Sequence, residues 1–177
     1  MKEWITKDRL NEVIKSIGAL AKMDVLVGIP ESENSRDDDA PNNATLGYIH
    51  EHGSPANNIP ARPFLVPGVA EAKGKYRPRL EAAAKLALDG KLKESLRQLD
   101  SAGIAAENSA KRKINSGDFV PLSEATLRVR ASRGRVGAAA ELERRAEGLP
   151  AGTELAKPLI DTGQLRNSIT HVVREKK

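Results

Sequence analysis

Residues 47–67 read GYIHEHGSPANNIPARPFLVP. The stretch begins within a helical turn predicted over 44–51. Gly53 is placed to end that turn, because glycine adopts the left-handed C′ conformation at little cost. Residues 54–58 are rich in turn formers. After them, prolines at 60, 63 and 67 fix φ and push each preceding residue towards extended backbone. The sequence therefore predicts a helix end, a loop and then a restrained segment, residues 59–67, termed the strap below.

The strap presents the side chains of Ile59, Arg62, Phe64 and Leu65 in fixed directions. We predict that these residues anchor the domain against either its own long helix or a neighbouring subunit. Phe64, one of only two phenylalanines, is expected in the core. Arg62 is expected to pair with a carboxylate or to cap the carbonyl groups of a helix end. The simpler alternative is an ordinary loop before a long helix.

A second informative stretch, residues 158–170, reads PLIDTGQLRNSIT. Asp161 or Thr162 is predicted to cap a helical turn. Gly163 and Leu165 are further candidate anchors in the core or at an interface. Asp161 beside Thr162 could be interpreted as an acid next to a nucleophile, but a helix cap is the favoured interpretation.

Three features together resemble the tail-completion, or neck, proteins of tailed bacteriophages, of the type called phage virion morphogenesis proteins. They are residues 27–30 (VGIP), residues 48–65 (YIHEHG leading to IPARPFL) and residues 161–169 (DTGQL followed by SI). The resemblance implies a structural virion protein that completes the tail or joins it to the filled head, as a ring-type homo-oligomer. It also implies contacts with neighbouring neck and tail proteins, and a location in the virion, with assembly in the host cytoplasm. The middle of the chain matches only in being helical and basic.

Composition limits the class of protein. The 177 residues suit one domain with a real core, and the net charge of +5 is only mildly basic. The chain has no cysteine, which excludes disulfides and thiol chemistry, and aromatic residues make up 3%. No apolar run approaches the roughly 20 residues of a membrane span, so no membrane partner is expected. The N-terminal residues do not have the pattern of a signal peptide. We therefore expect the protein in a reducing cytoplasm or in an assembly made there.

Periodicity predicts an α+β fold in which a small antiparallel sheet is covered by several helices. Strands are expected near 23–29 and 168–174, and they are expected to pair with each other because no other strong strand is available. A helix over 6–21, capped by Thr6, should pack its apolar stripe on the core. A long helical hairpin is expected from a helix ending near 88, kinked or broken near Arg77 by Pro78, and a second helix over 91–116. Ser123 should cap a short helix ending near 132.

Two segments are expected to lack a fixed structure. Residues 31–43 are polar and include Asp37-Asp38-Asp39, without the spacing of a calcium loop, and read as a mobile loop. Residues 132–157 are rich in Gly, Ala, Arg and Glu and read as flexible, apart from a short helix over 138–147. Neither segment belongs to the pattern that resembles neck proteins.

No group of residues predicts catalysis or a cofactor. His50-Glu51-His52 suggests a metal site, but on a helix residues two apart point to different sides, and no third ligand is evident. No phosphate-binding loop and no nucleophile elbow occurs. We therefore expect no enzyme activity, no metal and no cofactor.

The basic segment leaves a second function open, that of a small basic nucleic-acid-binding protein. Arg128, Arg130, Arg133 and Arg135 could contact DNA non-specifically through its phosphates. Against this, no aromatic residue follows Phe119 for base stacking, and glutamates are interleaved with the later arginines. A solvated face or a protein contact is favoured. Arginines facing a channel that carries DNA would be compatible with both functions.

Overall fold

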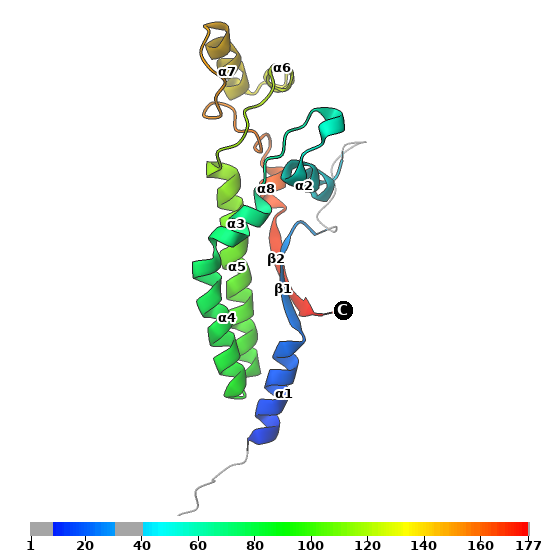
Figure 1. Ribbon diagram of the computed structural model, residues 1–177, viewed down its shortest axis with the longest axis vertical. Helices are drawn as coiled ribbons and strands as arrows, with labels where there is room; N and C mark the ends of the chain where they lie inside the picture. The colour runs from blue at the N-terminus through cyan, green and yellow to red at the C-terminus, as the bar shows by residue number, and fades with distance from the viewer. Residues whose placement is uncertain (1–8, 31–40, 177) are drawn as a thin grey trace, which may run out of the picture. The chain divides into compact units, whose positions relative to one another are not determined.

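The structure, a computed structural model, describes residues 9–30 and 41–176 (Figure 1). Contacts divide the chain into two compact units. Unit 1 contains Met1–Gly28, Val69–Ser109 and Thr170–Lys177, and unit 2 contains Ile29–Gly68 and Ala110–Ile169. Whether the two fold as the single domain that composition predicts stays a prediction. The mobile loop predicted near 31–43 lies almost wholly outside the described residues.

Unit 1 is built on an antiparallel strand pair, β1 (Met23–Gly28) and β2 (Thr170–Glu175). The register places Val27 opposite His171 and Leu26 opposite Val172. The α+β fold and the pairing of these two segments are therefore confirmed. The second strand begins two residues later than predicted, because the Ser168 hydroxyl donates to the Leu165 carbonyl at 2.9 Å and ends a short helix there.

The two faces of this sheet differ. His171 points at α5 (Leu92–Ser116), where its ring occupies the space in which a side chain at position 103 would lie. Gly103 is therefore required for the close approach of β2 to α5. On the opposite face, Leu26 and Val172 are 41% and 45% exposed. One face is thus covered by a helix and the other carries an uncovered apolar pair.

The predicted helical hairpin is formed by α4 (Lys73–Leu88) and α5, which lie side by side and antiparallel in Figure 1. Gly90, at φ 74°, makes the turn between them. The buried Ser95 hydroxyl donates to the Ala83 carbonyl at 2.8 Å, and small residues let the helices approach closely. Pro78 lies inside α4, so the helix is not broken near Arg77, and a kink at that position stays a prediction. The helix is interrupted instead at Ala72, between α3 (Leu65–Glu71) and α4.

Helix α1 (Leu10–Ala21) corrects a second expectation. Its apolar stripe was predicted to pack on the core, but Leu10, Ile14 and Ile17 are 62%, 57% and 41% exposed. The helix instead buries Ser16 and packs against α4. Val13 and Leu20, also part of the predicted stripe, are half-buried on the side of Ser16, so only part of the stripe is buried. Its predicted cap, Thr6, lies outside the described residues.

Unit 2 contains α2 (Asn43–His52), the 3₁₀ turn η2 (Pro55–Asn57), α6 (Glu124–Ser132), α7 (Val136–Ala146) and α8 (Gln164–Asn167). Ser123 caps α6 as predicted, since its hydroxyl accepts from the Thr126 amide at 3.3 Å. Apolar side chains of this unit are packed in its interior: Phe64, Ile114, Phe119, Leu122, Leu127, Leu159, Leu165 and Ile169. The flexibility predicted for 132–157 stays a prediction, but the segment contains α7 and an internal ion-pair network.

Candidate functional site

The strap is joined to α2 by a closed loop. Gly53 ends α2 at φ 78°, as the sequence predicted, and a Cβ there would lie 2.8 Å from the Ala61 nitrogen. Ser54 and Ile59 exchange two backbone hydrogen bonds, of 2.8 and 3.0 Å, around Asn58 in the left-handed conformation. Ile59 is half-buried in this bridge. The loop therefore sets the direction in which the strap leaves α2.

Glu51 fastens the strap to α2 a second time. Its carboxylate accepts hydrogen bonds from the backbone amides of Phe64 and Leu65, both at 2.8 Å, and of Val66 at 2.9 Å. These amides open α3, and the first amides of a helix have no partner within the helix. A carboxylate is the favoured group at this end of a helix. The sequence pattern did not reveal this role, because the cap lies thirteen residues before the first amide that it binds.

The three motifs that resemble neck proteins meet around Gly47. A Cβ at Gly47 would lie 2.7 Å from Ile29 Cδ1, 3.7 Å from Leu165 Cδ1 and 3.8 Å from Phe64 Cζ. Phe64 is 1% exposed, in agreement with the core position expected for it. The half-buried Leu65 follows it as the first residue of α3. Residues from distant parts of the sequence therefore form one packed centre in unit 2.

Arg62 binds carbonyl groups rather than a carboxylate. Its Nε donates to the Val120 carbonyl at 2.8 Å and its Nη2 to the Pro121 carbonyl at 3.1 Å. Carbonyl acceptors were one of the two predicted alternatives. These carbonyls lie in the connection before α6, however, and not at the end of a helix. Burial, and then the positive charge of Arg130, lower the pKa of Arg62.

The turn near Asp161 differs from its prediction. Asp161 caps no helix and pairs with Arg135, whose Nε donates to Asp161 Oδ1 at 2.8 Å. Gly163 is the residue before α8, at φ 82°, with no side-chain cap. The Thr162 hydroxyl accepts only a long hydrogen bond, 3.4 Å, from the Gln164 amide. The left-handed glycine, rather than a side-chain cap, allows the chain to turn into α8.

Of the four arginines considered for DNA, three have partners within unit 2. Arg128 pairs with Glu124 one turn away, and Arg135 pairs with Asp161. Arg130 donates to the carbonyls of Lys157 and Ile160, both at 2.9 Å, and of Pro158 at 3.0 Å. Arg130 is therefore an internal clamp in this structure. Arg133 is exposed.

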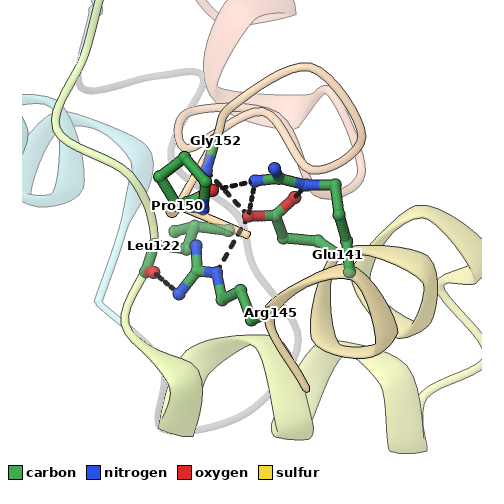
Figure 2. Close-up of polar contacts among 6 residues, drawn as sticks. Leu122, Glu141, Arg145, Pro150 and Gly152 are labelled. Atoms are coloured by element: carbon green, nitrogen blue, oxygen red, sulfur yellow. Dashed lines mark hydrogen bonds and ion pairs between the residues drawn. The ribbon is translucent and has the colours of Figure 1, made fainter. Parts of the chain in front are cut away.

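The later arginines surround Glu141, which is 1% exposed (Figure 2). Arg144 donates to both of its carboxylate oxygens, at 2.8 and 3.0 Å, and Arg145 donates at 2.8 Å. The Gly152 amide adds a bond of 2.8 Å, which ties the loop after α7 back to the helix. Hydrogen bonds from Arg144 have the largest effect on the pKa of Glu141 and lower it, whereas burial raises it. Hydrogen bonds from the Gly152 amide and from Arg145 lower it further, so that the pKa falls to about 2.

Two neighbouring clefts lie in unit 2, with volumes of about 460 Å³ and about 320 Å³. His50, Arg130 and Pro158 line both. Among the residues that the structure describes, no three His, Cys, Asp or Glu side chains are grouped so as to hold a metal ion. No helix within 9–30 or 41–176 has the length and hydropathy needed to cross a bilayer. The clefts offer arginines, hydroxyl groups and apolar walls, which are groups that recognise a partner.

No protein-family model matches this chain, and no curated protein or solved structure is significantly similar to it.

Proposed function

We propose that this chain is a structural subunit of the head–tail connection of a tailed bacteriophage. In this proposal it acts in tail completion or head–tail joining, as a ring-type oligomer in contact with neighbouring neck and tail proteins. The observation that supports it most is the meeting of Ile29, Phe64 and Leu165 around Gly47. The three motifs on which the resemblance rests are far apart in sequence, and one shared packing centre gives them a common role.

Exposed apolar side chains support the oligomer. Leu10, Ile14 and Ile17 follow one another at helical spacing on α1, and all three are exposed. Leu26 and Val172 form a second apolar pair, on the uncovered face of the sheet. An amphipathic helix normally buries its apolar stripe, so these surfaces suit contact with a second copy of the chain.

The alternative, a small basic nucleic-acid-binding protein, has less support. Arg128, Arg130 and Arg135 are engaged by groups of unit 2, and Arg144 and Arg145 neutralise Glu141. A phosphate backbone would have to compete with carboxylates for Arg128, Arg135, Arg144 and Arg145.

A genetic test addresses the role in assembly. In a phage that encodes this chain, a nonsense codon in its gene should leave DNA-filled heads and separate tails in infected cells. The same phage grown on a suppressor host is the control, and it should give complete virions. Complete, infectious virions without the protein would rule the proposal out.

A second test addresses the oligomer. The purified chain should form an oligomer that persists at about 1 M salt, because apolar contacts are not screened as ionic contacts are. Ile14→Asp should dissociate it, whereas Val136→Asp, at an exposed position of unit 2, should leave it intact. A chain that stays monomeric, and whose DNA binding is lost in the same salt, would favour the alternative function.

A further inference from the structure

The larger of the two neighbouring clefts that share His50, Arg130 and Pro158 lies between the strap and the start of α6. It has a volume of about 460 Å³ and is open to solvent on one side. Polar and apolar side chains both line it, among them Ile59, Arg62, Val120, Ser123, Thr126 and Arg130. Two arginines therefore share one concave surface with two hydroxyl groups.

Both guanidinium groups are fixed before any ligand arrives. Arg62 is 5% exposed, and its Nε and Nη2 donate to the carbonyls of Val120 and Pro121. Arg130 uses Nη1 and Nη2 on carbonyls of 157–160. Nη1 of Arg62 and Nε of Arg130 donate to no group within the described residues. Of the five N–H groups of a guanidinium, Arg62 thus keeps three and Arg130 two without an acceptor among the described residues.

Arg62 and Arg130 differ from the arginines of unit 2 whose positive charge is paired with a carboxylate. Glu141 forms ion pairs with both Arg144 and Arg145. Arg62 and Arg130 have no carboxylate within ion-pair distance in the described part of the chain. Asp161 is the nearest negative influence on Arg130, but it is bound by Arg135. Carbonyl groups satisfy hydrogen bonds without cancelling charge, so two like charges line the same partly desolvated cleft, and Arg130 disfavours the charge of Arg62.

We propose that this cleft binds a carboxylate, held between Arg62 and Arg130 and accepting a further hydrogen bond from the Thr126 hydroxyl. A fixed arginine pair is suited to a carboxylate, because planar guanidinium groups match its two oxygens. Binding would relieve the repulsion between the two cations. The site does not depend on the head–tail role proposed above, because it rests on the charges and contacts of unit 2 alone.

The occupant is an acidic side chain of a partner protein that carries an apolar residue beside it. Ile59 and Val120 offer apolar walls next to the arginines, which suit the neighbour of an Asp or Glu on a protein segment. A nucleic-acid phosphate is the competing anion. None of the described residues that line the cleft is a Phe, Tyr or Trp on which a base could stack.

The wild-type full chain provides the direct test. Its arginine Nε–H signals are followed by NMR during titration with acetate, with inorganic phosphate and with chloride at equal ionic strength. Acetate should shift the signals of Arg62 and Arg130 along a saturating curve. Arg128, on the same helix as Arg130 but paired with Glu124, is the internal control and should shift little.

Two variants sharpen the result. Arg130→Gln should abolish the saturable shift at Arg62, whereas Arg128→Gln should leave it unchanged. Equal, non-saturating shifts at all three arginines would show that the cleft is not an anion site. Saturation by phosphate and by a short oligonucleotide, without saturation by acetate, would overturn the carboxylate assignment. If Arg130→Gln does not fold, the wild-type titration still decides between these outcomes.

Discussion

Nδ1 of His171 lies 2.6 Å from Oε2 of Glu107, and this contact joins the second strand of unit 1 to its longest helix. Nε2 of the same ring lies 3.1 Å from Oδ1 of Asp100, on the other side of Gly103. Burial of the ring lowers the pKa of His171, but the hydrogen bonds to Glu107 and Asp100 outweigh burial and raise it above 6.5. The doubly protonated ring donates to both carboxylates.

The first prediction concerns pH. A histidine whose pKa is raised by folding stabilises the folded chain below the unfolded pKa, about 6.5, and loses that contribution as pH rises through the folded pKa. We therefore expect the urea midpoint of unfolding to be higher near pH 6 than near pH 9. His171→Gln should reduce this difference, whereas His52→Gln, at an exposed position on α2, should not. An unchanged pH dependence in His171→Gln would contradict the contact.

The second prediction uses a matched pair of glycines in unit 1. Gly103→Ala should lower the free energy of unfolding by about 1–3 kcal/mol, because the new methyl group would overlap the His171 ring. Gly18→Ala should raise it by about 0.5–1 kcal/mol, since among the described residues no atom beyond the local helix backbone lies within 4 Å of the new methyl group, and alanine is the better helix former. Both values come from denaturant unfolding. A loss of similar size in both variants would mean that the ring does not pack on Gly103.

The third prediction concerns Glu51. Glu51→Ala leaves three amides at the start of α3 without their acceptor, and we expect the free energy of unfolding to fall by about 1–3 kcal/mol. Glu51→Gln keeps one acceptor oxygen and should cost less. Glu154→Ala, at an exposed position of the same unit, is the control. Equal stability of Glu51→Ala and the control would show that the cap contributes nothing.

The fourth prediction concerns the Glu141 network. A carboxyl group whose pKa is lowered by folding stabilises the chain above its ordinary pKa of 4.5, and the contribution is lost as pH falls through about 2. Glu141→Gln should lower stability at pH 7 by as much as about 3–5 kcal/mol, because two arginines lose their counter-charge. It should also flatten acid unfolding between about pH 4.5 and about pH 2. Glu143→Gln, exposed on the same helix, should do neither.

The fifth prediction separates a core role from an interface role for Phe64. Phe64→Ala should destabilise the folded chain by about 3–5 kcal/mol, as expected for a buried aromatic residue. Tyr48→Ala removes an exposed ring and should change stability by no more than about 0.5 kcal/mol. Denaturant unfolding and sedimentation are measured on each variant. A Phe64→Ala chain that stays folded but no longer assembles would assign Phe64 to an interface instead.

Local signals predicted the parts of the fold that depend on local chemistry. Alternating apolar residues predicted both strands, a lack of other strands predicted their pairing, and glycine predicted the end of α2 at Gly53. Features that depend on distant partners were missed. The stripe on α1 predicted a buried face, but the residue buried on that helix is Ser16, and Leu10, Ile14 and Ile17 of the stripe are exposed. In the sequence, Glu51 belongs to a possible metal motif. Only the structure shows that its carboxylate binds the amides of the strap.

The basic segment shows the same limit. Glu141 was interpreted with its neighbours as a solvated mixture of charges, because the sequence alone does not show that a loop returns to cover it. The cap predicted at Asp161 failed for a related reason, since Arg135 competes for the same carboxylate. Composition predicts how much charge a segment carries, but it does not predict which charges are paired inside the fold.

The pairing of Gly28 with Thr170 has a consequence for folding kinetics. Every residue of unit 2 lies between these two partners in the sequence. Closing so long a loop adds little to the equilibrium cost, about 0.6 kcal/mol for each doubling of length. Contacts of such high sequence separation do slow folding, however. The two strands are therefore expected to pair late, after local helices have formed. Until then the apolar residues of the first strand lack their partner strand.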